Sequence, residues 1–495
     1  MSRWRPFRRV RCIKPSAKLN FMLGLFSTLN LASRSLQAQM TGIEVTGQNI
    51  SNINTPGYSR QTVQISASPD IATSVGPEGT GADATSIQQM VSNLLNNQIQ
   101  SQNSTSGYWN SQQSALQSAE NGLDEFLNGS SSTSSTSSTG STSDSGLSGQ
   151  LTALFNAFQS VATSPTSISA RQALISQAQT VAASFNNIDS QLTSLKSSLN
   201  SSLSSNVTSA NQLLTGIATL NSQIATAQFS GGNANDLSDE REQDLENLSQ
   251  LTNITTSSGA NGAVNVTIGG QTLVSGNTVN DTLQTYDAGG GQMLVQTATG
   301  KVNLTLTGGS MQGTIDARDG TLATMQSSVN TLASTLITQV NTTQSGGYGL
   351  TGTTGNSFFN GTDASTITVN PSLVNDPSLV QASDSATAPG DNTVALALAN
   401  LATTTQSGLD NQTFNDSYDS TVQDLGTALQ NANTEVTNQT AVTSMLSTQR
   451  GSVSGVNVDE EMTNMMTFQQ AYQASAQLVT TINTMLTDTL AMKTS

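Results

Sequence analysis

Histidine is absent from this chain of 495 residues, and cysteine occurs once, as Cys12. Without histidine, Ser-His-Asp and Cys-His catalysis, His-ligated zinc and haem held by a proximal histidine are excluded. A single cysteine also excludes disulfides within the chain, iron–sulfur clusters and cysteine-rich zinc sites. Because most of the usual side chains of catalytic centres are missing, we expect no enzymatic activity, no catalytic residues, no metal site and no cofactor.

Charge is scarce and mostly of one sign. Charged residues make up 10% of the sequence, and 16 Lys and Arg against 32 Asp and Glu give a net charge of −16. An acidic chain does not suit a phosphate backbone, so we expect no nucleic-acid partner. Hydrophobic residues still reach 35%, enough for a core. No stretch of about 18 or more apolar residues occurs, so we predict no transmembrane segment.

The first 21 residues differ in charge from the rest. They contain seven of the sixteen basic residues and no acid, which leaves 9 basic against 32 acidic residues from Met22 onward. A basic segment before the apolar stretch 19–32 is compatible with a secretory signal. A basic arm for membrane or nucleic acid is a second interpretation. We favour a third, in which translation begins at Met22 and residues 1–21 are a non-native extension with a mis-assigned start.

A strict seven-residue repeat begins at Met22. Its apolar positions are Met22, Leu29, Leu36, Ile43 and Ile50. A weaker companion seam consists of Leu25, Ala32, Gln39, Thr46 and Ile53. This spacing predicts a helix with the narrow apolar stripe of a coiled coil. The pattern ends near Asn52, and Pro56-Gly57 is typical of the centre of a type II turn.

The C-terminal end of the chain has a matching repeat. Its two seams are Met465, Tyr472, Val479 and Leu486, and Phe468, Ser475, Ile482 and Thr489. We expect the helix to begin near Asn457 as its cap, with Glu460 completing a capping box. The three acids at 459–461 are interpreted as capping and dipole compensation, not as a metal or acid–base site. The two terminal helices are expected to pack together.

Between the termini, apolar spacings of three and four predict a continuous helix over about 170–228, on the order of 85 Å long. Further helices are expected around 322–336 and 422–436, so the molecule should be a rod-like bundle. Strands are expected only in two inserts, at 264–268 and 302–306 around a glycine turn at 289–291, and at 367–369. The acidic cluster at 236–246 lacks the spacing of a calcium loop and is interpreted as a solvated helix face.

Several motifs together resemble one known family. Residues 49–61 read Asn-Ile-Ser-Asn-Ile-Asn-Thr-Pro-Gly-Tyr-Ser-Arg-Gln, and residues 454–461 read Ser-Gly-Val-Asn-Val-Asp-Glu-Glu. Both resemble the terminal motifs of bacterial flagellar rod, hook and hook-associated proteins. Interior segments at 234–241, 170–175, 355–359 and 390–399 are similar to the hook-associated members. The resemblance covers essentially residues 22–490, with the motifs in the family's order.

The resemblance implies a structural component of the bacterial flagellum: a hook–filament junction protein that assembles on the hook tip and connects the filament. It also implies export through the flagellar type III apparatus to an extracellular position. The implied partners are further copies of the chain in a junction ring, the hook protein, a second hook-associated junction protein and a cytoplasmic FlgN-like export chaperone on the C-terminal helix. The residues expected to serve assembly or partner binding are Leu29, Leu36, Ile43, Ile50, Asn52, Pro56, Gly57, Met465, Phe468, Tyr472, Val479, Ile482 and Leu486.

The expected fold is mainly α with β inserts: a rod-like helical bundle, terminal coiled-coil helices packed together, and outer β-rich domains. After the extension at 1–21, the expected parts are the N-terminal half of the inner coiled coil at 22–66, a helical rod domain at 67–252 with a Ser/Thr-rich loop at 129–148, a β-rich insert at 253–310, a rod helix at 311–345, an outer β and loop segment at 346–417, a rod helix at 418–450, and the C-terminal half of the coiled coil at 451–495. The Ser/Thr-rich loop is interpreted as a solvated spacer, with O-glycosylation as the alternative.

Two other functions remain open at this stage. One is a different flagellar axial protein, either the hook subunit or the second junction protein. The other, from a separate class, is an adhesin or surface enzyme secreted by a signal peptide, which would be cleaved near Ala38.

Overall fold

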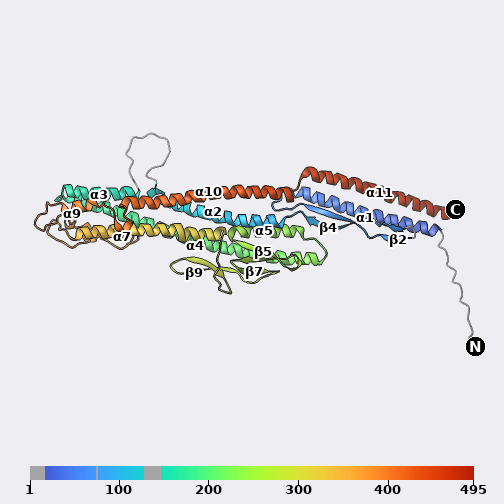
Figure 1. Cartoon of the computed structure of the whole chain (residues 1–495), viewed down its shortest axis with the longest axis horizontal. Coiled ribbons are helices and arrows are strands. Elements are labelled where there is room, and N and C mark those ends of the chain that lie inside the picture. The colour runs from blue at the N-terminus through green and yellow to red at the C-terminus, as the bar shows by residue number, and fades with distance from the viewer. Residues whose placement is uncertain (1–16, 74–75, 128–145, 495) are drawn as a thin grey trace, which may run out of the picture.

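The computed structural model describes residues 17–73, 76–127 and 146–494 of the chain. Long helices run nearly parallel and make an elongated molecule, with the start of α1 and the end of α11 at the same tip (Figure 1). The expected class, mainly α with small β inserts in a helical rod, is confirmed. The Ser/Thr-rich tract at 130–145 and most of the N-terminal extension lie outside the described residues. Among the described helices, none is both long and apolar enough to cross a membrane.

Helices α1 (Ala17–Ser51) and α11 (Val458–Thr494) lie antiparallel and form the terminal hairpin, as the paired repeats predict. Along the pair, Ser35 meets Ser475 with the two Oγ atoms 3.0 Å apart. Near its middle, a Cβ added at Gly42 would come within 2.8 Å of the Phe468 ring. The two helices therefore approach closely at a glycine, and any larger residue there would push them apart.

Strands also occur beside the terminal hairpin, where none was expected. Strands β1 (Gln61–Ala67) and β4 (Ala82–Gln89) pair antiparallel with a bulge between Gln64 and Ile65, and β2 (Ile71–Thr73) pairs with β3 (Gly76–Glu78). The ribbon lies along α1. An ion pair joins the two: the Arg34 guanidinium on α1 lies 3.2 Å from the Asp83 carboxylate on β4. The expectation that strands are confined to two inserts was wrong. Gln, Ser and Thr fill most ribbon positions, so the alternation of apolar residues that would reveal strands is weak.

The rod is a bundle around α4 (Ile168–Phe229), the long helix that the spacing predicted. Helix α4 packs with α2 (Asn93–Leu127), α3 (Leu147–Thr163) and α7 (Leu322–Ser345), and α10 (Phe414–Ser454) packs on these three helices. Shorter helices α5 (Asn235–Leu251) and α6 (Gly309–Asp316) fill the side of the bundle next to the terminal hairpin. The main apolar core runs along the rod and includes the tilted ring pair of Phe158 and Phe358, with centroids 5.3 Å apart.

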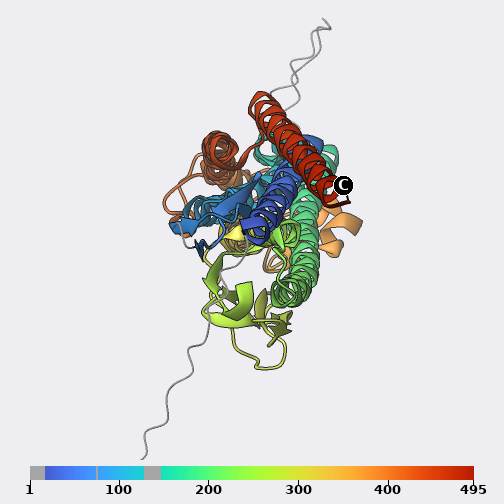
Figure 2. The same ribbon diagram turned by 90° about the vertical axis from the view of Figure 1, so that its right-hand side faces the viewer.

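A small β insert packs against one side of α4, and Figure 2 shows it projecting from the rod. Strands β5 (Ile254–Ser258), β6 (Val264–Ile268), β7 (Gln271–Ser275) and β8 (Thr278–Val279) form an antiparallel sheet in chain order. Strands β9 (Leu283–Asp287) and β10 (Met293–Thr297) form a hairpin around the predicted glycine turn.

The strand predicted at 302–306 is not formed. Only Asn303 makes a β-bridge there, to Gln296. Lys301, with a φ of 52°, lies in the turn that brings this segment back along β10. Two backbone hydrogen bonds join the segment to β10: the Thr297 N–H donates to the Val302 carbonyl at 2.9 Å, and the Leu304 N–H donates to the Val295 carbonyl at 3.1 Å.

The segment at 346–417 lies at the end of the rod opposite the terminal hairpin (Figure 1). It contains the two-residue strands β11 (Phe359–Asn360) and β12 (Thr368–Val369), and the short helices α8 (Pro371–Asn375) and α9 (Thr393–Asn400). The buried guanidinium of Arg171 fastens this segment to α4, because it donates to the carbonyl oxygens of Pro165 and Val380.

Candidate functional site at the junction of the rod and the terminal hairpin

Three of the motifs noted in the sequence meet where the terminal hairpin joins the rod. They are the end of α1 with the start of β1 (49–61), the first turns of α5 (234–241) and the passage from α10 to α11 (454–461). The backbone N–H of Arg60 donates to the Ser454 carbonyl at 2.8 Å, and the Met90 N–H donates to the Arg60 carbonyl at 2.8 Å. We call this meeting point the motif junction.

The turn after α1 brings the chain back onto that helix. Gly57 has a φ of 80°, and the Tyr58 N–H donates to the Thr55 carbonyl at 3.2 Å, as in the predicted type II turn with Pro56 before the glycine. The returning chain is then fixed by the Asn49 side chain. Its Oδ1 accepts from the Tyr58 hydroxyl at 2.8 Å and from the Gln61 N–H at 3.0 Å, while its Nδ2 donates to the Gln61 carbonyl at 2.8 Å.

A buried carboxylate occupies the centre of the motif junction. The Glu461 side chain is 3% exposed, and its Oε1 lies 2.7 Å from Nε of Arg60. Its Oε2 accepts from Asn49 Nδ2 at 3.0 Å. A buried carboxylate is costly unless it is paired and hydrogen-bonded, so the two ends of the chain depend on each other here.

Two acids in the first turn of α11 bind Arg60 in addition to the capping that the sequence predicted. Asn457 Oδ1 caps the helix by accepting from the N–H groups of Asp459 at 3.0 Å and Glu460 at 3.4 Å. However, the Glu460 carboxylate, expected to complete a capping box, instead accepts from Arg60 Nη2 at 2.7 Å. Capping therefore does not fully explain the three acids, because two of them bind an arginine about 400 residues away. No spacing rule within one helix could indicate such a partner.

The acidic face of α5 is also tied into the junction, contrary to its interpretation as a solvated face. Asp239 Oδ2 accepts from the Ser59 N–H at 2.9 Å, and Asp236 accepts from Gln61 Nε2 at 2.8 Å. Farther along, Glu242 accepts from Gln100 Nε2 at 2.9 Å, and Glu246 pairs with Arg450. These carboxylates join α5 to β1, α2 and α10.

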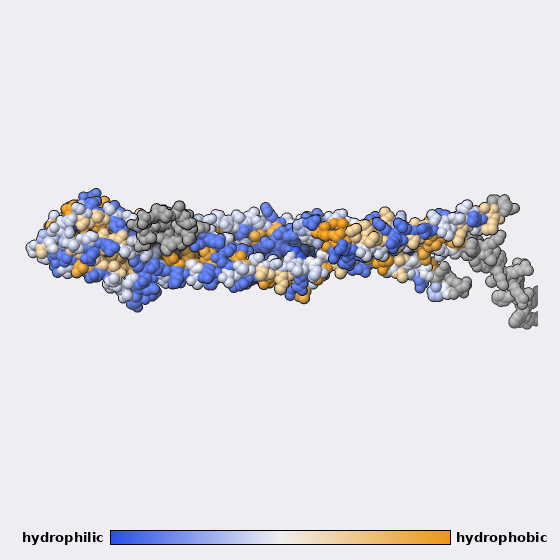
Figure 3. All heavy atoms as spheres, turned by 90° about the horizontal axis from the view of Figure 1, so that it is seen from above, coloured by the Kyte–Doolittle hydropathy of each residue, from blue (hydrophilic) through white to orange (hydrophobic). Residues whose placement is uncertain are grey.

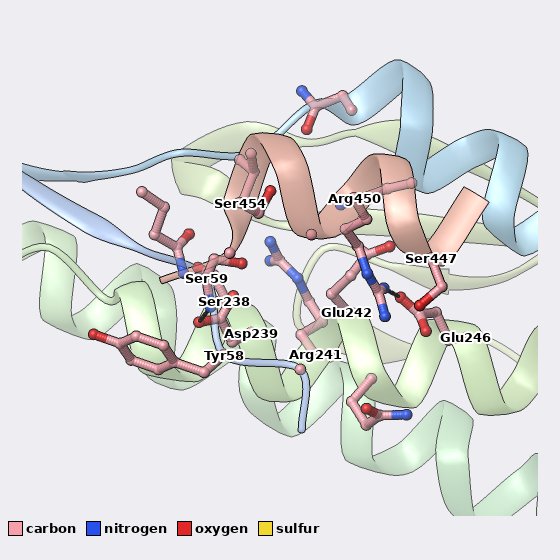
Figure 4. A pocket seen from close by; sticks show the side chains of 18 of the residues that line it. Tyr58, Ser59, Ser238, Asp239, Arg241, Glu242, Glu246, Ser447, Arg450 and Ser454 are labelled. Atoms are coloured by element: carbon pink, nitrogen blue, oxygen red, sulfur yellow. Dashed lines mark hydrogen bonds and ion pairs between the residues drawn. The ribbon is translucent and has the colours of Figure 1, made fainter. Parts of the chain in front are cut away.

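The junction encloses a polar cavity of about 500 Å³ between α5, the end of α10 and the turn after α1. Figure 4 shows Tyr58, Asp239 and Arg450 on its walls, with the Ser59–Asp239 and Arg450–Glu246 interactions drawn. In the described parts of the chain, no group of His, Cys, Asp or Glu residues could hold a metal ion. The site is therefore built from structural hydrogen bonds and ion pairs.

Burial alters the acidity of several junction groups. It raises the pKa of the Tyr58 phenol to about 12, with a further contribution from the carboxylates of Asp236, Asp239 and Glu461. The phenol thus remains a hydrogen-bond donor throughout the neutral range. Burial also raises the pKa of Asp239 and of Glu242 above the ordinary values of these carboxyl groups.

The residues predicted for assembly fall on two sides of the terminal hairpin. On α1, the strict seam of Leu29, Leu36, Ile43 and Ile50 is only half-buried, whereas Leu25, Ala32 and Thr46 of the companion seam are buried. On α11, Ile482 is buried, while Met465, Phe468, Val479 and Leu486 are half-buried.

The remaining predicted residues are more exposed. Tyr472 is 39% exposed although the repeat placed it on the seam, because two helices cover only one side of a ring of this size. Asn52 is half-buried, and Pro56 and Gly57 are exposed in the turn at the motif junction.

Partly exposed apolar side chains continue along the hairpin. On α11, Leu478, Met485 and Met492 are spaced by seven residues and are 38%, 49% and 73% exposed. On α1, Phe26 and Met40 are 52% and 53% exposed. Figure 3 shows apolar atoms at the surface where the rod meets the hairpin and along the hairpin itself. We call Leu478, Met485 and Met492 the outer stripe of α11.

Known proteins are similar to this chain in both sequence and fold. Residues 133–359 match the helical domain of flagellar hook-associated protein FlgK, and residues 449–492 match the C-terminal region of flagellar basal body rod proteins. The flagellar hook-associated protein 1 of Bacillus subtilis is 29% identical over 507 residues, covering 93% of this chain and 96% of that protein. In sequence and in fold, the chain is thus similar to FlgK, a flagellar hook-associated protein.

Further flagellar hook-associated proteins are similar to the chain over nearly their full length. The flagellar hook-associated protein 1 of Salmonella typhimurium is 25% identical, covering 92% of this chain and 98% of that protein. The same protein of Escherichia coli K12 is 24% identical over the same shares of the two chains. The solved structure of the flagellar hook junction protein FlgK from Burkholderia pseudomallei has the same fold, with a TM-score of 0.60 at 18% identity. The structural similarity covers 72% of this chain and all of the Burkholderia chain.

We predict that Arg60→Met loosens the motif junction, because it leaves the buried Glu461 carboxylate without its cation. The free energy required to open the first turn of α11 locally should fall by about 3 kcal/mol. Arg34→Met is the matched control: its pair with Asp83 is about half exposed and should contribute about 1 kcal/mol or less. Amide hydrogen exchange of residues 50–61 and 457–465, followed by mass spectrometry, measures both. Equal protection in the two variants would contradict the assigned role of Arg60.

A second prediction concerns pH. Carboxyl groups whose pKa is raised by folding bind protons more tightly in the folded chain. Asp239 and Glu242 should therefore increase the free energy of unfolding as the pH falls through their folded pKa values, up to the full gain below the unfolded values near 4.

The measurement compares urea midpoints at pH 7 and pH 5. On acidification, the urea midpoint of the wild-type chain should rise more than that of the variant Asp239→Asn/Glu242→Gln, in which neither side chain can titrate. Glu240→Gln, at an exposed position of the same helix, should respond like the wild type. The same pH response in all three chains would refute this assignment.

Proposed function

We propose that this chain is the hook–filament junction subunit of a bacterial flagellum: it assembles on the tip of the hook and connects the filament. The observation that carries the proposal is that relatives matched over more than nine-tenths of both chains are flagellar hook-associated proteins. In this proposal the chain is a structural protein without catalytic activity. It is exported through the flagellar type III apparatus and works outside the cell.

The terminal hairpin is proposed as the surface on which copies of the chain assemble. Its strict α1 seam is half-buried and the outer stripe of α11 is exposed, so much apolar area is left uncovered by the chain itself. Full burial of an exposed Leu or Met side chain contributes about 1.5–3 kcal/mol, and a side chain that is already half-buried contributes roughly half of that. Net negative charge elsewhere disfavours unspecific association of free copies.

In this proposal, the hook protein and a second hook-associated junction protein are the axial neighbours of the ring. The motif junction sets the angle at which the hairpin leaves the rod. It fixes that angle because backbone hydrogen bonds and the Arg60–Glu461 pair link three separate segments there. A ring of identical subunits requires the same angle in every copy.

We predict that charges on the outer stripe of α11 prevent the junction from forming. Cells carrying Leu478→Asp/Met485→Asp in place of the native gene should export the chain but show hooks without filaments by electron microscopy. Burying either aspartate against apolar neighbours costs more than the lost contact. Gln477→Asp/Thr484→Asp adds two charges at the same spacing on exposed polar positions and should retain filaments. Filaments at the wild-type frequency in the first variant would rule out this surface.

Before export, the C-terminal helix is proposed to dock on a cytoplasmic FlgN-like chaperone. The stripe offered is Met465, Phe468, Tyr472, Val479, Ile482 and Leu486, at the spacing used by helices that bind in grooves. Several of these side chains also pack on α1, so chaperone binding and closure of the hairpin should compete.

We predict that Tyr472→Asp/Val479→Asp weakens binding to the purified chaperone of the same host by at least about tenfold, as expected for residues central to an interface. Titration calorimetry of the full chain measures the affinity. Gln473→Asp/Thr480→Asp, one position along the helix on exposed polar sites, serves as the control. Unchanged affinity in the Tyr472 and Val479 variant would exclude this docking stripe.

A further inference from the structure

The exposed methionines are concentrated in one part of the molecule. Although methionine is usually buried, seven methionines in the described chain are at least 42% exposed. All of them lie in the terminal hairpin or in the part of the rod that adjoins it: Met40, Met90, Met445, Met462, Met466, Met485 and Met492. In the body of the rod, Met311 and Met325 are 0% and 4% exposed.

Four of the exposed methionines lie on α11, which our proposed function uses for assembly: Met462, Met466, Met485 and, in the last turn, Met492 at 73% exposed. Met485 belongs to the outer stripe and is 49% exposed. Met462 and Met466 are one turn apart near the start of the helix, at 53% and 55% exposed. These thioethers are open to solvent in the free chain, yet they lie beside the apolar surface that assembly would cover.

We propose that Met462, Met466 and Met485 are oxidation sites through which peroxides control assembly of the chain. The thioether sulfur attacks one peroxide oxygen, and the O–O bond breaks. The sulfur gains a sulfoxide oxygen and loses two electrons, and the peroxide is reduced to water or an alcohol. Residues 22–495 contain no cysteine, so no thiol in this part of the chain would react first. This inference rests on the proposed function of the terminal hairpin.

The structure separates the effect on assembly from an effect on folding. A sulfoxide on a solvent-exposed side chain stays hydrated, so the free chain keeps its fold. When the same side chain is buried between subunits, the sulfoxide oxygen loses water without a fixed partner, which weakens the contact by on the order of tenfold for each site. Met311 and Met325 in the rod are shielded from the oxidant by burial.

Leucine at the same positions would provide similar apolar area without reactivity toward peroxide. The three-leucine variant Met462→Leu/Met466→Leu/Met485→Leu therefore tests the chemistry while it preserves the surface. This variant and its control also carry Met492→Leu, so that the fourth exposed methionine of α11 does not contribute. Met311→Leu/Met325→Leu is the matched control, because it removes methionines that are buried and leaves the three proposed sites intact.

The experiment adds the purified full-length chain, before or after hydrogen peroxide treatment, to hooks isolated from cells that lack its gene. Bound chain is quantified after pelleting, peptide mass spectrometry maps the sulfoxides, and circular dichroism checks the fold. Oxidation should lower binding of the wild-type and control chains by at least about tenfold with an unchanged fold. Treatment of the oxidised chain with methionine sulfoxide reductases should restore its binding to hooks. The three-leucine variant should keep at least half of its binding after peroxide.

Three other results would be decisive in the opposite direction. Undiminished binding of a chain with sulfoxide at all three sites overturns the inference, and so does equal peroxide sensitivity of the three-leucine variant. If untreated chain does not bind hooks at all, the proposed function fails, and this result is distinguishable from failure of the oxidation sites alone.

Discussion

The buried carboxylate of Glu461 is the constraint around which the two ends of the chain are arranged. Its position in the first turn of α11 would be unfavourable without Arg60 and Asn49, which come from the turn after α1 and from α1 itself. Because these groups are held by backbone bonds to α10 and by carboxylates of α5, the same network also fixes the hairpin to the rod. The motifs at 49–61, 234–241 and 454–461 are three parts of one structural joint.

The rod and the terminal hairpin differ in how far the chain buries its own apolar side chains. In the rod, helices around α4 cover each other, and aromatic rings such as Phe158 and Phe358 are fully enclosed. In the terminal hairpin, two helices and a narrow ribbon cannot enclose a stripe on every side. The rod therefore has an enclosed core, while the terminal hairpin leaves apolar side chains exposed, and we propose that neighbouring copies cover them.

Periodic features of the sequence predicted the structure well, and non-local ones did not. The seven-residue repeats gave both terminal helices and their pairing, and three-four spacing gave α4 almost to the residue. The ribbon of β1 and β4 was missed because polar side chains hide its alternation. The segment at 302–306 makes only the bridge between Asn303 and Gln296, although its alternation predicted a strand. At the site, the motifs could be located, but the pairing of Arg60 with Glu461 could not, since it joins positions about 400 residues apart.

The pairing of the first helix with the last also has a consequence for the order of folding. Ser35 and Ser475 are separated by 440 positions, and Asn49 and Glu461 by 412, so these contacts close the largest loops in the molecule. Such contacts carry the greatest loop-closure entropy and form after local ones. During synthesis α11 leaves the ribosome after α1 and the rod, because it follows them in the chain. The hairpin can therefore close only after the rod between its two helices has been made.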